Sequence, residues 1–517
     1  MVRKWKSMGN IPERQLSRLS TYVAARMGLH FPEERWQNLE QAINLAAGEL
    51  DCDDGESCIE WLLSSSPTSH QIEILASHLT VGETYFFRDK GLFKALEQPI
   101  LSELIRHRRS NGKFLRIWSA GCSSGEEPYS IAILLSQMIP DIEDWNISIL
   151  ATDFNARSLQ KAVRGVYGPW SFRDVKPEIK KEFFKQTGDG RFELISRVRK
   201  MVDFCSLNLV EDSYPSLVNK TNAFDIILCR NVLMYFVGES AQKVVKNLHR
   251  SLLEGGLLIV SPIESSVRLF SQFSTVSVRG RIFFKKQGAV GAGDFPARLF
   301  ETPKPALEPA PNPDPAAAPV FKSVIELLPP RQEEHGGSAM FEVSNTDDPN
   351  PKELYEQASA LYLAGSYPEA IEKVEKLLLQ SSSDAAGWAL LTRIYANCGK
   401  LDKALECSAK AVSSDKLNAG YHYLMATIFQ ELDRTEDAAV SLRRALYIDS
   451  KFIPAHVALG NICRKSGDHK NAARHFENAL FLLNSEPADQ VLAESEGINA
   501  QRLTEILRLM QQSEIEE

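Results

Sequence analysis

The sequence predicts a multidomain protein in which a doubly wound α/β sheet lies between a small helical domain and an array of helical repeats. Three observations predict this fold. Residues 11–79 carry apolar side chains at helical spacing. From about residue 80, strand-like runs alternate with helices, which is typical of a parallel sheet with helices on both faces. After residue 350, a 34-residue pattern occurs four times.

The totals restrict the class of protein. A chain of 517 residues has room for two to four domains. Its net charge of −8 argues against bulk nucleic-acid binding and leaves room only for a local basic patch. No apolar segment follows the basic residues 1–6 and no run reaches membrane-spanning length, so we expect a cytoplasmic protein without membrane insertion. The eight cysteines lack any zinc spacing, which predicts free thiols and no metal site.

The first predicted domain is all-helical and covers residues 1–80. Leu16, Leu19 and Val23 recur at helical spacing, and Pro32 opens a second helix with Trp36 on its apolar face. No residue spacing in this domain indicates catalytic chemistry by itself.

The second predicted domain covers residues 81–287 and contains the sheet. Strand-like runs occur at residues 114–118, 147–152, 202–207, 224–229, 256–261 and 281–285, and helical patterns include residues 156–163 and 240–253. A polar, irregular stretch at about residues 165–200 interrupts the alternation. We expect it to form a small inserted β-subdomain.

The C-terminal part is predicted to be a linker followed by repeats. Residues 288–350 are rich in Pro and Ala and have no core of their own, which predicts an extended linker. Four 34-residue blocks then begin at residue 351. Small residues recur at their eighth and twentieth positions, namely Ala358, Thr392, Ala426 and Gly460, and then Ala370, Ala404, Ala438 and Ala472.

This repeat is the tetratricopeptide pattern, in which small residues let paired helices pack closely. We therefore expect four repeats over residues 351–487 and a capping helix over residues 488–517. Such arrays mostly bind a peptide or helix in their concave face, and some only pack against their own chain. The array thus predicts an unidentified protein or peptide partner.

The stretch that carries most chemistry is a turn between the strand at residues 114–118 and the following helix. Gly121 and Gly125 lie in it, at a spacing unlike the dinucleotide pattern Gly-x-Gly-x-x-Gly. Small residues there allow a ligand to approach the backbone. Glu126 and Glu127 begin the helix and would repel a phosphate, so the turn favours a ligand with a positive centre.

Other polar residues follow neighbouring strands. Asp153 ends the second strand, where an acid can accept both hydroxyls of a ribose; the alternative is that it caps the next helix. Arg230 and Asn231 follow the strand at residues 224–229. Because the carboxyl ends of parallel strands meet at one edge, we expect one crevice. The aromatic segment at residues 80–89 is either a lid over this crevice or a domain-joining segment.

Five stretches resemble the motifs of the CheR-type chemoreceptor glutamate methyltransferases, in order and with compatible spacing. They are residues 80–89, 119–130 (with G-E-E-P-Y-S), 151–153, 207–209 and 224–236 (with C-R-N-V-x-x-Y-F). The resemblance covers about residues 11–287. Members of that family with tetratricopeptide repeats also occur.

The resemblance implies a Rossmann-like class I methyltransferase sheet that binds S-adenosylmethionine as methyl donor. Its sulfonium would explain the acids at the turn. Carried over residue by residue, the family motifs assign the lid contacts to Gly82, Thr84 and Arg88; the amino-acid end to Glu126 or, preferably, Glu127; the ribose to Asp153; the adenine to Asn208 and Leu209; the methionine moiety to Arg230 and Asn231; and the substrate carboxylate to Tyr235 and Arg88.

The implied activity is methylation of glutamate side chains on the cytoplasmic domain of a methyl-accepting chemoreceptor, with the repeats choosing partners. Two alternatives remain: a methyltransferase for another carboxylate or protein, and a cofactor-binding sensor with the repeats as output. This chain departs from the family at Gly82, where Asn is frequent, and at Glu33 and Glu34, which make a basic receptor-docking face unexpected. The short excursion favours an enzyme that needs no receptor-tail tether.

Overall fold

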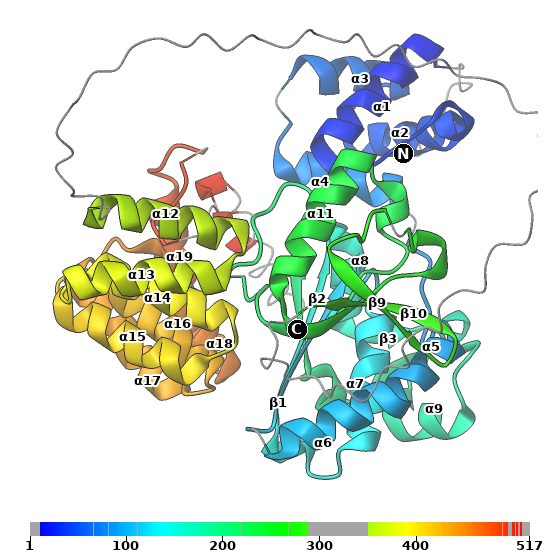
Figure 1. Ribbon diagram of the computed structural model, residues 1–517. Helices are drawn as coiled ribbons and strands as arrows, with labels where there is room; N and C mark the ends of the chain where they lie inside the picture. The colour runs from blue at the N-terminus through cyan, green and yellow to red at the C-terminus, as the bar shows by residue number, and fades with distance from the viewer. Residues whose placement is uncertain are drawn as a thin grey trace, which may run out of the picture.

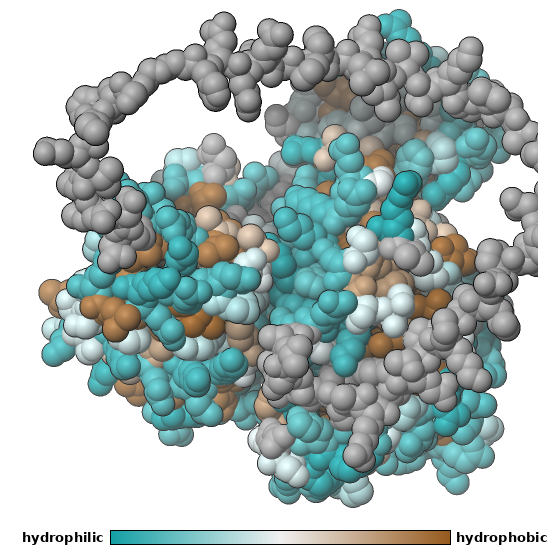
Figure 2. Space-filling view, in the orientation of Figure 1, coloured by the Kyte–Doolittle hydropathy of each residue, from teal (hydrophilic) through white to brown (hydrophobic). Residues whose placement is uncertain are grey.

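The computed structural model describes three groups of helices and strands (Figure 1). The described residues are 11–65, 67–80, 82–110, 112–217, 219–266, 268–287, 350–488, 490–494, 499–501, 503–504 and 507–508. The predicted linker, with the apolar residues 321–328, lies almost entirely outside them. Over α11 and the repeats, the face drawn in Figure 2 is mainly hydrophilic, with hydrophobic residues in small groups.

The N-terminal group is all-helical, as predicted. Its helices are α1 (Glu13–Met27), α2 (Trp36–Glu49), α3 (Gly55–Ser64) and α4 (Ser69–Leu79). Pro32 precedes a short 3₁₀ turn over Glu33–Arg35, so the second helix begins at Trp36. Leu19 and Val23 are fully buried against the other helices, because they share one face of α1.

The central sheet has seven strands in the order β6-β2-β1-β7-β8-β10-β9. Their bounds are Phe114–Ala120 (β1), Asn146–Asp153 (β2), Val202–Ser206 (β6), Phe224–Leu228 (β7), Leu252–Ile259 (β8), Phe273–Val278 (β9) and Arg281–Lys286 (β10). The first five in this order pair in parallel, and β10 and β9 pair antiparallel. This confirms the predicted doubly wound fold.

Two details differ from the sequence prediction. β8 begins at Leu252, four residues earlier than expected, because α11 (Gly238–Ser251) ends sooner. β9 was not predicted, since its Ser and Thr residues dilute the apolar pattern. Both differences lie away from the carboxyl edge of β1, β2 and β7.

Helices cover both faces of the sheet. They include α5 (Lys90–Ala95), the π-helical stretch Leu96–Leu101, α6 (Ser102–Ser110), α7 (Glu126–Met138) and α8 (Ala156–Arg164), in addition to α11. Successive residues of β1 enter different cores: Ile117 joins the cluster under α7, and Trp118 the cluster under α11. Both side chains are buried, as expected for a central parallel strand.

The predicted inserted β-subdomain is present. It has a three-stranded sheet in the order β3-β5-β4, formed by Val166–Tyr167, Phe192–Leu194 and Phe184–Gln186, with the short helices α9 (Pro177–Phe183) and α10 (Ser196–Arg199). Phe86 is fully buried against it, with its ring 4.8 Å from that of Tyr167 and 5.0 Å from that of Phe184. The aromatic segment at residues 80–89 is therefore anchored in the inserted subdomain through Phe86. This agrees with the interpretation of the segment as one that joins domains.

Four helical hairpins form the C-terminal array. They pair α12 (Pro351–Ala364) with α13 (Tyr367–Gln380), α14 (Ala385–Asn397) with α15 (Leu401–Ser414), α16 (Ala419–Glu431) with α17 (Thr435–Ile448), and α18 (Ile453–Lys465) with α19 (His469–Leu483). Ala370, Ala404, Ala438 and Ala472 are completely buried. Beyond α19, Leu503 and Leu507 pack on this array, while Ile506 and Met510 of the predicted cap lie outside the described residues.

Within the described ranges, every helix is too short or too polar to cross a membrane. All eight cysteines are free thiols, and four of them are only half-buried.

One buried ion pair connects α6 to the sheet. Arg108 donates to Asp225 of β7 at 2.6 Å, and both side chains are almost completely buried. The backbone N–H of Arg116 also donates to Asp225, at 2.9 Å. Burial raises the pKa of the Asp225 carboxyl, and the guanidinium of Arg108 opposes this shift.

We predict that Arg108→Met lowers the free energy of unfolding by about 3–5 kcal/mol, because it leaves a buried carboxylate without its cation. Arg109→Met is the matched control: Arg109 pairs with Asp141 at 2.8 Å on the surface, where solvent screens the charges, so its loss should change the free energy of unfolding far less. Urea titration followed by hydrogen exchange of the β7 amides measures both variants. Equal effects would contradict the prediction.

Candidate functional site

A pocket lies at the carboxyl ends of β1, β2 and β7. Its volume is about 890 Å³, which includes space that is open to solvent at its mouth. This is the point where the strand order reverses direction from β1, which is where open α/β sheets bind ligands. Among the predicted site residues, its walls contain Gly82, Asp153, Asn208, Leu209, Asn231 and Tyr235.

The glycine turn after β1 forms one wall. Gly121 has φ +81°, and a Cβ there would lie 2.3 Å from Cγ2 of Val232. Its N–H donates to the carbonyl of Thr152 at 2.7 Å, which joins the turn to β2. Only glycine meets both demands, so the backbone can approach a ligand as the sequence predicts.

Asp153 ends β2 and faces the pocket. Its two carboxylate oxygens accept the backbone N–H groups of Ser123 and Asn155, each at 2.8 Å. The N-cap of α8 is Asn155, whose side chain accepts from the N–H of Ser158, so the alternative capping role of Asp153 is wrong. Burial raises the pKa of Asp153, and the backbone donors oppose this shift.

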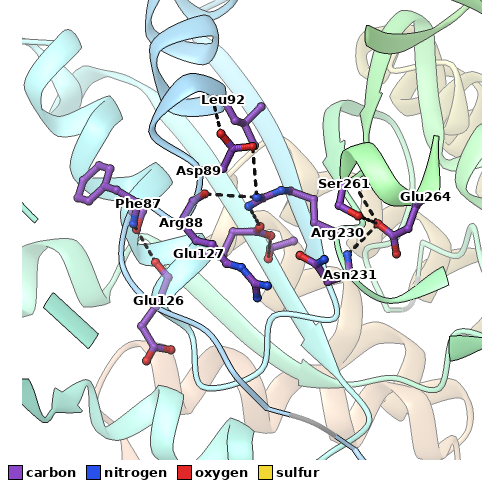
Figure 3. A network of polar contacts seen from close by, with 12 residues as sticks. Phe87, Arg88, Asp89, Leu92, Glu126, Glu127, Arg230, Asn231, Ser261 and Glu264 are labelled. Atoms are coloured by element: carbon purple, nitrogen blue, oxygen red, sulfur yellow. Dashed lines mark hydrogen bonds and ion pairs between the residues drawn. The ribbon is translucent and has the colours of Figure 1, made fainter. Parts of the chain in front are cut away.

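The two glutamates at the start of α7 point in different directions (Figure 3). Glu126 is 1% exposed, and its oxygens accept from the hydroxyls of Ser124 at 2.8 Å and Ser171 at 2.9 Å. Glu127 accepts from Ser119 and from Nη1 of Arg230, both at 2.8 Å. Glu126 thus ties α7 to the inserted subdomain, while Glu127 faces the end of β7.

Arg230 is the centre of a chain of charges (Figure 3). Besides Glu127, it donates to the backbone carbonyl of Arg88 at 3.3 Å and lies 4.0 Å from Asp89. Asp89 in turn accepts two bonds from Arg281, at 2.7 and 2.6 Å. The end of this segment is therefore tied to Arg230, which follows β7, and to β10, through the backbone carbonyl of Arg88 and the carboxylate of Asp89.

Glu264 is a positioning residue that sequence reasoning missed. Its carboxylate accepts the N–H groups of Asn231 at 2.8 Å and Val232 at 2.7 Å, and the hydroxyl of Ser261 at 2.5 Å. Asn231 has φ +58°, a left-handed conformation that these bonds hold in place. The Ser261-x-x-Glu264 capping box was the available sequence signal.

The N-terminal helices also contribute to the pocket, which the sequence did not predict. Met27, His30, Phe31 and Arg35 line it beside the sheet residues. The guanidinium of Arg35 lies 5.4 Å from the centre of the Tyr235 ring. The helical group and the sheet therefore share one pocket.

The remaining predicted residues lie outside the lining set. Thr84 is half-buried without a described pocket contact. Arg88 donates from Nη1 to the carbonyl of Glu83 at 2.7 Å, so its side chain is held on its own segment. Glu126, Glu127 and Arg230 are likewise absent from the pocket lining.

The geometry defines a class of protein. A Rossmann-like sheet, a pocket at the reversal of strand order and a carboxylate at the end of β2 suit a nucleoside ligand. The carboxylates of Glu126 and Glu127 beside the turn fit the cationic nucleoside S-adenosylmethionine better than a nucleoside phosphate. This fold and this site are typical of methyltransferases that use this donor.

Comparison with known proteins supports this class. The family described as "CheR methyltransferase, SAM binding domain" matches residues 82–281, and a tetratricopeptide repeat matches residues 455–491. Chemotaxis protein methyltransferase 2 of Vibrio cholerae is 36% identical over 206 residues, which cover 40% of this chain and 70% of that protein. Chemotaxis protein methyltransferase 1 of Pseudomonas aeruginosa is 36% identical over 221 residues, which cover 41% of this chain and 77% of that protein.

The chain therefore belongs to the CheR family of chemotaxis methyltransferases, and S-adenosylmethionine is its methyl donor. Among solved structures, MamA of Desulfovibrio magneticus RS-1 is 23% identical, covers 26% of this chain and 77% of its own, and has a TM-score of 0.25. That score is too low to support a structural argument.

Proposed function

We propose that this protein transfers the methyl group of S-adenosylmethionine to glutamate side chains on the cytoplasmic domain of a chemoreceptor. The product is a glutamate methyl ester, and the setting is adaptation in a cytoplasmic chemosensory pathway. The observation that carries the proposal is one pocket with Asp153 on one wall and Tyr235 on another, in a chain whose relatives are named chemotaxis protein methyltransferases.

The pocket residues suggest how the cofactor is held. Asp153 takes the ribose hydroxyls, since its carboxylate faces the pocket. Asn208 and Leu209 bracket the adenine. The Asn208 amide is fixed for this, because its oxygen accepts the N–H of Val210 at 3.0 Å. Gly82 and Thr84 contact the cofactor from the segment at residues 80–89, in which Gly82 lines the pocket.

The ion pair of Glu127 and Arg230 suits the amino-acid end of the cofactor. That end carries an ammonium and a carboxylate, and the pair offers one group of each opposite charge within 2.8 Å. Glu126 has both oxygens occupied by serine hydroxyls and is the weaker candidate. Asn231, which follows Arg230 in the chain and lines the pocket, would contact the same end of the cofactor.

The reaction needs little acid–base chemistry. When bound, S-adenosylmethionine supplies an electrophilic methyl group on a sulfonium. A glutamate side chain with a pKa of about 4.3 is already ionised at neutral pH, so it needs no general base. The protein must align the carboxylate with the methyl carbon and exclude water from it.

Tyr235 and Arg88 are assigned to the substrate carboxylate. The hydroxyl of Tyr235 donates a hydrogen bond, and Arg88 orients by charge. A tight ion pair would reduce the nucleophilicity of the carboxylate, so Arg88 acts in orientation and not in activation. Its present bond to the carbonyl of Glu83 is exchanged for the substrate.

The methyl-ester product gives the first test of the function. With radiolabelled S-adenosylmethionine and a receptor cytoplasmic fragment, we expect label that alkali releases as methanol, because carboxyl esters hydrolyse in base. Arg88→Ala should lose most of this transfer, whereas Arg109→Ala, on the far surface of α6, should retain it. Alkali-stable label, or near-normal transfer by Arg88→Ala, would contradict the respective assignment.

A second prediction concerns Asp153 and pH. The ionised carboxylate accepts ribose hydroxyls, and burial raises its pKa above the ordinary value. Acidification protonates this carboxylate and should therefore lower the affinity for S-adenosylhomocysteine. The loss should begin at a higher pH than it would if the ribose were held by an exposed aspartate with an ordinary pKa. Asp153→Ala should weaken binding at pH 7 at least tenfold, lose most methyl transfer and flatten this pH dependence. Calorimetric titration between pH 5 and pH 8 measures it, and unchanged affinity would refute the ribose role.

A third prediction separates the two glutamates. Glu127→Gln removes the charge opposite Arg230 and should weaken S-adenosylhomocysteine binding about tenfold. Glu126→Gln disturbs only the bonds to Ser124 and Ser171, so it should reduce thermal stability more than affinity. Calorimetry and thermal unfolding of both variants test this. The reverse pattern would assign the cofactor to Glu126.

A further inference from the structure

The repeat array lies against the methyltransferase part of the chain, at the amino-terminal edge of its sheet (Figure 1). Arg116 of β1 forms an ion pair with Glu431 of α16, and both side chains are largely buried. Lys465 of α18 lies 3.2 Å from Asp203 of β6. Glu431 and Lys465 are each the last residue of the first helix of a repeat.

The turns between paired helices add close packing. A Cβ on Gly365 would lie 2.9 Å from Cγ of Arg250, and one on Gly399 would lie 2.7 Å from Cδ2 of Leu253. Both glycines have positive φ. The array therefore docks through a continuous set of contacts with β1, β6 and the α11–β8 junction.

A loop of the sheet domain packs against the array. The loop between β6 and β7, residues 207–223, carries Leu217, which is 3% exposed. Leu217 belongs to one cluster with side chains of α14, α15 and α16: Ala389, Ala396, Ala404, Ala411, Leu424 and Ile428. Arg116 also donates to the carbonyl of Lys220 at 3.0 Å, so its guanidinium joins the loop to Glu431.

The same loop begins at the pocket. Asn208 and Leu209 line it. Eight residues after Leu209, Leu217 packs against the side chains of the array. Between them, the hydroxyl of Tyr214 donates to the carbonyl of Leu209 at 2.9 Å, and its ring packs edge-on against Trp118 at 5.5 Å. One short, internally bonded loop thus contacts both the pocket and the repeats.

We propose that the repeat array controls cofactor affinity through this loop. Docked repeats hold Leu217 and Lys220, and through Tyr214 they hold Leu209 against the adenine. A partner that takes the surface around Leu217 and Glu431 must displace the loop and so weakens cofactor binding. The proposal rests on the assignment of Asn208 and Leu209 to the adenine.

The test uses the full chain and one charge reversal. Glu431→Arg places two cations together and should undock the array, while Glu436→Arg makes the same charge change on the exposed start of α17. Carbodiimide, which joins only amines and carboxylates in contact, should cross-link Lys465 to Asp203 in the wild type and in Glu436→Arg. Mass spectrometry should show this cross-link lost in Glu431→Arg.

Calorimetry with S-adenosylhomocysteine then measures the coupling. We expect the Kd of Glu431→Arg to rise at least fivefold, that of Glu436→Arg to stay within twofold, and hydrogen exchange at residues 208–217 to quicken only in Glu431→Arg. The double variant Arg116→Glu, Glu431→Arg should recover both cross-link and affinity, which excludes a folding defect.

The contrary outcomes are distinct. A lost cross-link with unchanged Kd overturns the coupling, and a wild-type chain without the cross-link overturns the docking. Unaltered cross-link and Kd in Glu431→Arg also overturn the proposal. A wild-type chain that fails to bind S-adenosylhomocysteine overturns the proposed function and this proposal with it.

Discussion

The site depends first on the ion pair between Glu127 and Arg230. It joins α7, the helix that follows β1, to the end of β7, and the strand order reverses between β1 and β7. An almost buried pair is costly unless its remaining polar atoms are bonded. Here Ser119 bonds the carboxylate, and the carbonyl of Arg88 accepts from the guanidinium. The pair therefore holds three segments in one geometry.

Around this pair, the backbone is held in conformations that need outside support. Gly121 turns with positive φ against Val232, and Asn231 turns with positive φ under the carboxylate of Glu264. Both turns stand at the carboxyl edge of the sheet and expose backbone toward the pocket. The result is a preformed wall, so less ordering is needed when a ligand binds.

The pocket is also a junction between parts of the chain. The N-terminal helices bring His30 and Arg35 to it, and the N–H of His30 donates to the carbonyl of Tyr235 at 2.6 Å. Phe86 anchors the segment at residues 80–89 in the inserted subdomain. On the opposite edge of the sheet, the repeats hold the loop that carries Leu217. The pocket and the repeat interface are thus joined by short connections and do not belong to a single domain.

The sequence by itself determined the features that local pattern encodes. Helical spacing, alternation of strands and helices, and a 34-residue period depend on neighbours along the chain, so the three-part fold was predictable. Asp153 and the glycine turn were predictable because strand ends of a parallel sheet meet at one edge.

Only the tertiary structure decided what depends on distant or directional contacts. Glu126 and Glu127 are adjacent on one helix, where successive side chains point about 100° apart, so packing alone sends one to Ser171 and the other to Arg230. Glu264 reaches Asn231 from the turn that follows β8, and Leu217 contacts repeat residues that are far away in the sequence. A sequence pattern records spacing along the chain, whereas these contacts depend on how separate elements pack in space.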